Sequence, residues 1–70
     1  MNINAKRGDK VVFSHPNAGT SIHQAIAREH LAEGQAYTVE RTEVEFSHTD
    51  VFLHEFPDTF FNSVLFSDAD

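Results

Sequence analysis

The chain contains no cysteine and no tryptophan among its 70 residues, and it has only three glycines and two prolines. Because cysteine is absent, neither a disulfide nor a thiolate-bound metal can reinforce the domain. A chain of this length forms one domain and buries only about 60% of its unfolded surface. The core is therefore expected to be thin and the margin of stability small.

Basic residues are also scarce. Five lysines and arginines stand against eleven aspartates and glutamates, which gives a net charge of −6 at pH 7. Lys6, Arg7 and Lys10 gather near the N-terminus beside Asp9, but they form only a weak basic patch. Since binding to a nucleic-acid backbone requires clustered lysine and arginine, we expect only weak binding to nucleic acid.

Long apolar runs are absent as well. No segment approaches the ~20 apolar residues that a membrane-spanning helix needs. The first five residues, Met-Asn-Ile-Asn-Ala, lack the apolar segment of a secretory signal. The sequence thus predicts a cytoplasmic protein with no membrane partner.

Aromatic residues, by contrast, are abundant: the chain has seven phenylalanines and one tyrosine. Each can bury roughly 150–250 Å², so a few of them can replace a larger aliphatic core. Eight are more than a core of this size readily hides. We therefore expect some of them to line an exposed patch, and such patches often mark partner sites.

Local patterns predict a mainly β domain with one helix. The expected elements are strands at residues 10–14, 35–45, 51–56 and 64–66, a helix at 20–33, and a hairpin turn at 47–50. Ser21 and Gln24 match a capping box, and Gly34 supplies a left-handed stop after the helix. The strand pattern blurs over residues 41–45, which indicates a bend or bulge. The predicted domain spans residues 8–66, between a flexible leader (1–7) and an acidic tail (67–70).

The expected strand at 51–56 carries apolar groups on both faces. Val51 and Leu53 share the face assigned to the core, and the opposite face reads Phe-His-Phe. A second copy of the chain could cover this strip through a twofold contact. Alternatively, the predicted helix folds over the strip, with Ile22 and Ile26 as its cover. The predicted partner-binding residues are Phe52, His54, Phe56 and Phe60.

Three short motifs follow one another along the chain. They are Gly8-Asp9, Leu31-x-x-Gly34-x-x-Tyr37-x-Val39 and Phe61-Asn62-Ser63-x-x-Phe66. In this spacing the chain resembles SH3-like small-barrel proteins, and more narrowly short uncharacterised proteins of phages and bacteria, over residues 8–66. The resemblance implies a small SH3-like antiparallel barrel. The predicted helix, inserted between strands 1 and 2, departs from it, because such barrels usually have a shorter loop at that place. It also implies that Tyr37, Phe61 and Phe66 lie in the core.

Five histidines invite the hypothesis of a metal site. His23 and His30 lie on one side of the expected helix but about two turns, or roughly 10 Å, apart, too far to share one Zn²⁺. Neither H-x-x-x-H nor H-x-x-E-H spacing occurs. We therefore predict no metal and no cofactor. The start of the helix offers a candidate anion-binding site at Thr20, Ser21 and Ile22, although a capped helix start is its ordinary role.

No catalytic motif is present, and we predict that the protein is not an enzyme. Ser14-His15 and Ser47-His48 are sequence neighbours, so their side chains diverge, and no G-x-S-x-G elbow occurs. The favoured function is a small non-enzymatic binding module that acts through an aromatic and acidic surface. It would form a homo-oligomer and, in the phage setting of the resemblance, occupy a host protein. The first alternative is an oligomer that sequesters a small nucleotide-like ligand, and the second is a nucleic-acid-binding small barrel.

Overall fold

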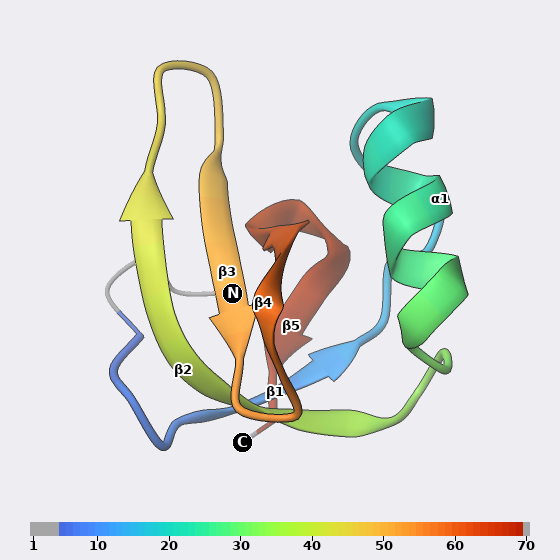
Figure 1. The fold of residues 1–70 in the computed structure, drawn as a ribbon. Helices are drawn as coiled ribbons and strands as arrows, with labels where there is room; N and C mark the ends of the chain where they lie inside the picture. The colour runs from blue at the N-terminus through green and yellow to red at the C-terminus, as the bar shows by residue number, and fades with distance from the viewer. Residues whose placement is uncertain (1–4, 70) are drawn as a thin grey trace.

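Strands rich in β-branched and aromatic residues build one curled antiparallel sheet, with a single α-helix beside it (Figure 1). The computed structural model describes residues 5–69. Its elements are β1 (Lys10–Phe13), α1 (Ser21–His30), β2 (Ala36–Val44), β3 (Thr49–Leu53), β4 (Phe56–Asn62), the 3₁₀ turn η1 (Ser63–Leu65) and β5 (Phe66–Asp68). The predicted mainly β class, with the helix between the first two strands, is confirmed.

The strands are arranged in the order β4-β3-β2-β1-β5, and every neighbouring pair is antiparallel. Val11 pairs with Tyr37 of β2, and Phe13 pairs with Phe66 of β5. β4 and β5 form the two edges of the sheet, and η1 joins them directly. The sheet is barrel-like, but it does not close because its two edge strands do not pair with each other.

The core fills the concave side of this sheet with aromatic and aliphatic side chains. Phe61 packs edge-on against Phe66, with ring centroids 6.3 Å apart, and Phe13 packs against Phe66 at 6.1 Å. Val51 and Leu53 are fully buried, as expected of the face assigned to the core. The predicted core positions of Tyr37, Phe61 and Phe66 are also confirmed. The buried apolar residues are Val11, Phe13, Ala27, Leu31, Tyr37, Val39, Val51, Leu53, Phe61, Leu65 and Phe66.

Helix α1 is capped one residue earlier than the sequence predicted. Thr20 is the N-cap, and its Oγ1 accepts a hydrogen bond from the His23 backbone N–H at 3.3 Å. Ser21 is already the first helical residue. The Gln24 side chain donates to the carbonyls of Asn17 and Gly19 instead of the cap, so the predicted capping box is wrong. Within residues 5–69 no helix has the length and apolar character needed to cross a membrane.

The helix ends at His30, three residues before the predicted end, and a turn then leads into β2. In that turn the Gln35 N–H donates to the Ala32 carbonyl at 3.1 Å. Gly34 has a φ of +84°, which confirms the predicted left-handed conformation. Its N–H donates to the Phe13 carbonyl at 2.7 Å, so this turn is bonded to β1.

The prediction of one strand over residues 51–56 is wrong. β3 ends at Leu53, His54 and Glu55 form a turn, and Phe56 pairs back with Leu53 as the start of β4. Contacts with β2 hold this turn: the His54 N–H donates to the Thr38 carbonyl at 2.7 Å, and the Glu55 carboxylate accepts from the Thr38 N–H at 3.0 Å. Pro57 was expected to end a strand but lies inside β4, where it is tolerated because an edge strand has one unpaired side.

The hairpin between β2 and β3 also turns earlier than predicted. Thr49 and Asp50 belong to β3, and the turn is closed by a 2.8 Å hydrogen bond from the Glu45 N–H to the His48 carbonyl. The register shift in β2 lies between Val39 and Arg41, just before the predicted irregularity at 41–45.

Both ends of the described chain are bonded to the sheet. Residues 1–4 of the predicted leader and Asp70 of the predicted tail lie outside the described residues. The Gly8 N–H, at the start of the predicted domain, donates to the Val39 carbonyl at 2.8 Å, so the chain is bonded to β2 before β1 begins. β5 runs to Asp68, two residues beyond the predicted limit at Phe66, and the Ala69 N–H donates to the Lys10 carbonyl at 3.2 Å.

A valine at position 34 tests the left-handed turn. No atom lies within 4 Å of a Cβ built on Gly34, so the cost of Gly34→Val comes from the backbone φ of +84° alone. We expect a loss of about 1–3 kcal/mol in the free energy of unfolding, measured by urea denaturation. Gly34→Asn, which tolerates this conformation, should lose clearly less. Equal stability of the valine variant and the wild type would contradict this account.

The turn at Glu55 predicts a specific pH dependence. Burial of the Glu55 carboxyl opposes ionisation, but hydrogen bonds from the Thr38 and Glu55 backbone outweigh it and lower the pKa below its usual value. A lowered folded-state pKa adds stability above the unfolded value of about 4.3, and this stability is lost as the pH falls through the folded pKa. Glu55→Gln should therefore be less stable than wild type at neutral pH, and the gap should shrink in acid. Urea melts across this range measure the gap, and Glu33→Gln controls for the lost charge.

Candidate functional site

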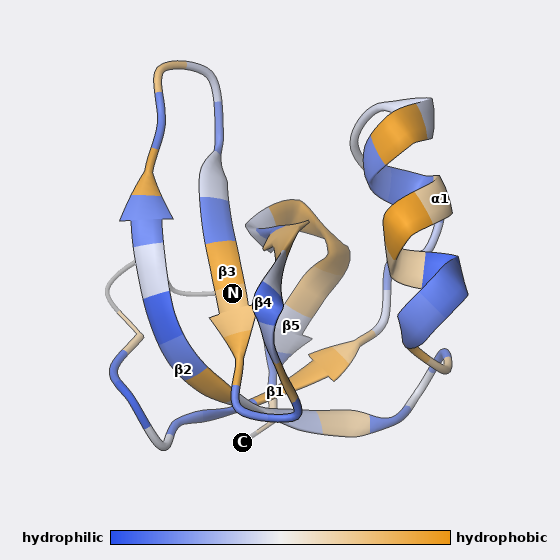
Figure 2. Cartoon of the chain, in the orientation of Figure 1, coloured by the Kyte–Doolittle hydropathy of each residue, from blue (hydrophilic) through white to orange (hydrophobic). Residues whose placement is uncertain are grey.

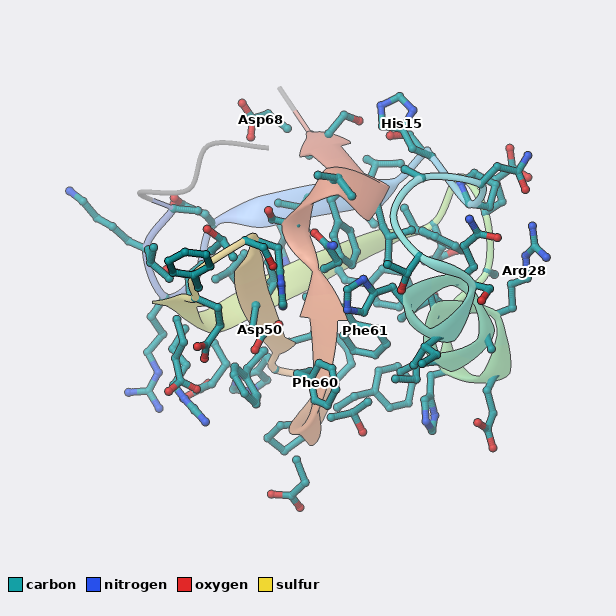
Figure 3. The ribbon with its side chains drawn as sticks, turned by 90° about the horizontal axis from the view of Figure 1, so that it is seen from above. His15, Arg28, Asp50, Phe60, Phe61 and Asp68 are labelled. Atoms are coloured by element: carbon teal, nitrogen blue, oxygen red, sulfur yellow. The ribbon has the colours of Figure 1, made fainter. Side chains whose placement is uncertain are left out.

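The four predicted partner-binding residues do not form one surface. Phe52 and Phe60 are register partners on β3 and β4, so their side chains share the outer face of the sheet. Phe60 is 41% exposed, and Phe61 lies on the side toward α1 (Figure 3). The Arg41 guanidinium lies 3.7 Å from the centre of the Phe52 ring. Phe52 is thus covered within its own chain by a cation–π contact.

Phe56 belongs to the inner side of the fold, so the predicted Phe-His-Phe strip is wrong. Its ring lies 5.3 Å from that of His30 on α1 and 6.3 Å from that of Phe61. The helix therefore covers Phe56, as the alternative interpretation proposed, but it does so through His30. Ile26 is partly buried against the core. Ile22, the other residue of the predicted cover, is 69% exposed.

His54 lies in the turn between β3 and β4. Its Nδ1 is 3.1 Å from Oε1 of Glu40, and the Arg7 guanidinium pairs with the same carboxylate. The hydrogen bond from Arg7, followed by that from His54, holds the pKa of Glu40 below its usual value. His54 thus belongs to an exposed charge cluster that joins the N-terminal segment to β2.

The β2–β3 hairpin is the most exposed apolar part of the described chain. Residues 43–47 are all exposed, Val44 is 72% exposed, and Phe46 at the tip is fully exposed. The hairpin extends beyond the body of the sheet (Figure 1), and apolar residues lie at its free end and at the start of α1 (Figure 2). The sequence predicted that some of the eight aromatic residues line an exposed patch, and Phe46 is one of them, although it was not among the predicted partner-binding residues.

An open cavity of about 430 Å³ lies where the hairpin faces the start of α1 and η1. Of the predicted anion-binding residues, only Thr20 lines it, and its Oγ1 already accepts the His23 N–H. Ser21 and Ile22 are exposed outside the lining. The lining consists of Ala18, Gly19, Thr20, His23, Ser47, His48, Asn62 and Val64.

Two histidines face each other in this cavity. The ring centroids of His23, on α1, and His48, on the hairpin, are 4.9 Å apart. Nε2 of His48 is 2.8 Å from Oδ1 of Asp50, and Nδ1 of His23 is 3.0 Å from Nδ2 of Asn62. Asn62 is only 5% exposed, and its Oδ1 accepts the Val64 N–H at 3.1 Å.

Sequence reasoning missed this pair because the two histidines come from distant segments, and only folding brings them together. The one available signal was Asn62, a polar residue inside the apolar closing motif. Among residues 5–69, no group of three or more histidine, cysteine, aspartate or glutamate side chains could hold a metal ion.

A family model described as Bacteriophage T4 protein Y07B matches residues 2–69. The chain belongs to this family. The expected likeness to a short phage protein is thereby confirmed at the level of the family. No curated protein and no solved structure gives a significant match. The Y07B match spans nearly the whole chain, so it includes the hairpin, α1 and the cavity between them.

Replacement of Asn62 tests how the cavity is held together. Asn62→Ala removes the acceptor for the Val64 N–H and the donor that faces His23. Because Asn62 is buried, we expect a loss of about 1–3 kcal/mol in unfolding free energy, measured by denaturation. Asn17→Ala, at an exposed asparagine in the loop before α1, is the matched control. An unchanged midpoint for Asn62→Ala would show that these hydrogen bonds contribute no stability.

Proposed function

We propose that this protein is a small non-enzymatic binding module that engages another protein through its hairpin end. The hairpin end is the surface formed by the β2–β3 hairpin, the first turn of α1 and η1. One observation carries the proposal: Phe46 is fully exposed at the tip of a hairpin that projects from the sheet. Of the five large apolar residues that are exposed within residues 5–69, four lie at this end, namely Ile22, Val44, Phe46 and Val64.

The energy of burial supports a partner at this end. Full burial of one phenylalanine or valine side chain is worth about 1.5–3 kcal/mol. Single exposed apolar residues are common, but a group of them rimmed by polar residues is typical of an interaction surface. None of these four side chains is part of the buried core, so the fold does not depend on them.

The charges on the hairpin indicate the kind of partner. Glu43 and Glu45 flank Val44 and precede Phe46, and all four are exposed. Glu43 faces Asp50 across the strand pair, with Arg41 3.4 Å from Glu43. An apolar ring among carboxylates fits an apolar pocket bordered by lysine or arginine on the partner. We therefore propose the hairpin end as the aromatic and acidic binding surface, in place of the residues predicted from the sequence.

The partner that we favour is a host protein. This chain would act as a phage accessory protein that binds it in the cytoplasm. Membership in the Y07B family supports the phage setting. The strand order and the 3₁₀ turn between the last two strands support an SH3-like variant of the small barrel. Nucleic acid is a weaker candidate, because Arg7 is paired with Glu40 and the net charge is −6. Self-association through the hairpin end or through exposed Phe60 is a further candidate mode of binding.

Sequestration of a small ligand is the second candidate function, and the cavity beside the hairpin favours it. The cavity contains no lysine or arginine to neutralise a phosphate, so a nucleotide is a less suitable ligand than an uncharged molecule.

A photo-crosslinking amino acid at position 46 tests the hairpin end in infected cells. We expect one specific crosslinked partner from position 46 and none from position 32, an exposed alanine beyond the other end of α1. Adding Val44→Ser should reduce this product, because it removes apolar contact area without touching the core. Sedimentation of purified wild type and of Phe46→Ser distinguishes a host partner from a second copy of the chain. A wild-type oligomer that becomes monomeric in Phe46→Ser would identify a second copy. Equal crosslinking from positions 46 and 32 would refute the proposal.

A further inference from the structure

We propose that the cavity between α1 and the β2–β3 hairpin recognises an uncharged amide group through the Nε2–H of His23. The amide could belong to an asparagine or glutamine of a bound protein or to a free small molecule. The proposal goes beyond the hairpin end, because it assigns a ligand chemistry to the cavity itself. It depends on the orientation of one buried side chain, Asn62, which fixes the position of a proton on His23.

The orientation of the Asn62 amide follows from the backbone of η1. The Val64 N–H can only donate, and it lies 3.1 Å from the Asn62 atom assigned as Oδ1. A flipped amide would place two N–H groups against each other at this position. The oxygen therefore faces Val64, and the NH₂ group must face His23.

The proton on His23 is fixed as a consequence. The Asn62 Nδ2 donates to His23 Nδ1 over 3.0 Å, so Nδ1 is the acceptor and the neutral ring carries its proton on Nε2. His23 lines the cavity and is half-buried, and the Asn62 amide occupies its Nδ1, so Nε2–H is the remaining polar atom of the ring. Nε2–H makes no hydrogen bond to any residue between 5 and 69. The cavity thus contains a donor that has no acceptor in the described chain.

The remaining groups of the cavity favour an uncharged ligand. Its lining contains no lysine, arginine, aspartate or glutamate. The carboxylate of Asp50 contacts the lining residue His48. A carboxylate would meet this acidic neighbour and a chain of net charge −6, and an ammonium group has no acceptor for Nε2–H. An amide offers a carbonyl to Nε2–H and N–H groups to the hydroxyls of Thr20 and Ser47. Ala18 and Val64 provide apolar contact for the stem of the ligand.

The variant Asn62→Asp replaces the NH₂ donor that faces His23 with a carboxylate oxygen that accepts, and the side chain keeps nearly the same shape. One carboxylate oxygen keeps the bond from the Val64 N–H, and the other can only accept, so the proton of a neutral His23 must move to Nδ1. Nitrogen NMR of the imidazole, at a pH where the ring is neutral, should show Nε2–H in wild type and Nδ1–H in Asn62→Asp. Asn17→Asp adds the same charge at an exposed loop site and should retain Nε2–H. A wild-type ring protonated on Nδ1 would overturn the proposal.

Three probes of equal size, propionamide, propionate and propylammonium, test the ligand chemistry. With propionamide we expect saturable shifts of the His23 ring and the Val64 amide, and with the two ions we expect none. Loss of one neutral hydrogen bond should weaken propionamide binding about fivefold in Asn62→Asp, with no change in Asn17→Asp. Preference for propionate, or no saturable shift with propionamide, would refute the assignment.

Two further measurements identify the source of the amide, and a third separates the cavity assignment from the hairpin proposal. A small molecule retained in native mass spectra of wild type, and lost in Asn62→Asp, identifies a free ligand. Reduced crosslinking from position 46 in Asn62→Asp identifies a side chain of the bound protein. Propionamide binding that survives Phe46→Ser is expected, so failure of the hairpin proposal would leave the cavity assignment intact.

Discussion

The structure depends on the tight turn η1, which joins the two edge strands of an open sheet. Without a disulfide or a thiolate-bound metal, this small domain must place large side chains from β4 and β5 over one thin core. Three residues of 3₁₀ helix do this, because they bring Phe61 and Phe66 into edge-on contact at 6.3 Å and bury Leu65 between the strands. The Asn62 side chain caps this turn through the Val64 N–H, and the same side chain reaches His23 of α1. A single buried amide therefore connects the closing turn, the helix and the cavity.

Much of the fold was predictable because its signals are local. The alternation of buried and less buried residues that includes Val51 and Leu53 spans five consecutive residues. Gly34 marks a turn that requires a left-handed backbone conformation, which glycine adopts readily. The turn at His54 and Glu55 was missed because neither residue is a typical turn former. Bonds to Thr38 on another strand stabilise it, and no local pattern reports such contacts.

The candidate site was less predictable than the fold, since it depends on which distant segments meet. Phe52 and Phe56 look equivalent in sequence, but a turn separates them. Phe52 packs against the Arg41 guanidinium, whereas Phe56 packs against His30 of α1. His23 and His48 show no ligand spacing, and they become neighbours only when the hairpin faces the helix. Exposed Phe46 was recognisable as surplus to the core, but its place at a projecting tip follows from where β2 and β3 turn.

The position of Pro57 on β4 has a consequence for solubility. An open sheet offers the unpaired N–H and carbonyl groups of its edges to other chains, and apolar edge strands are common starting points of aggregation. β4 is such an edge and contains three phenylalanines, but Pro57 removes one donor and exposed Asp58 adds a charge next to it. The residue pair that resembled a strand terminator in the sequence thus disfavours pairing of this edge with further copies of the chain.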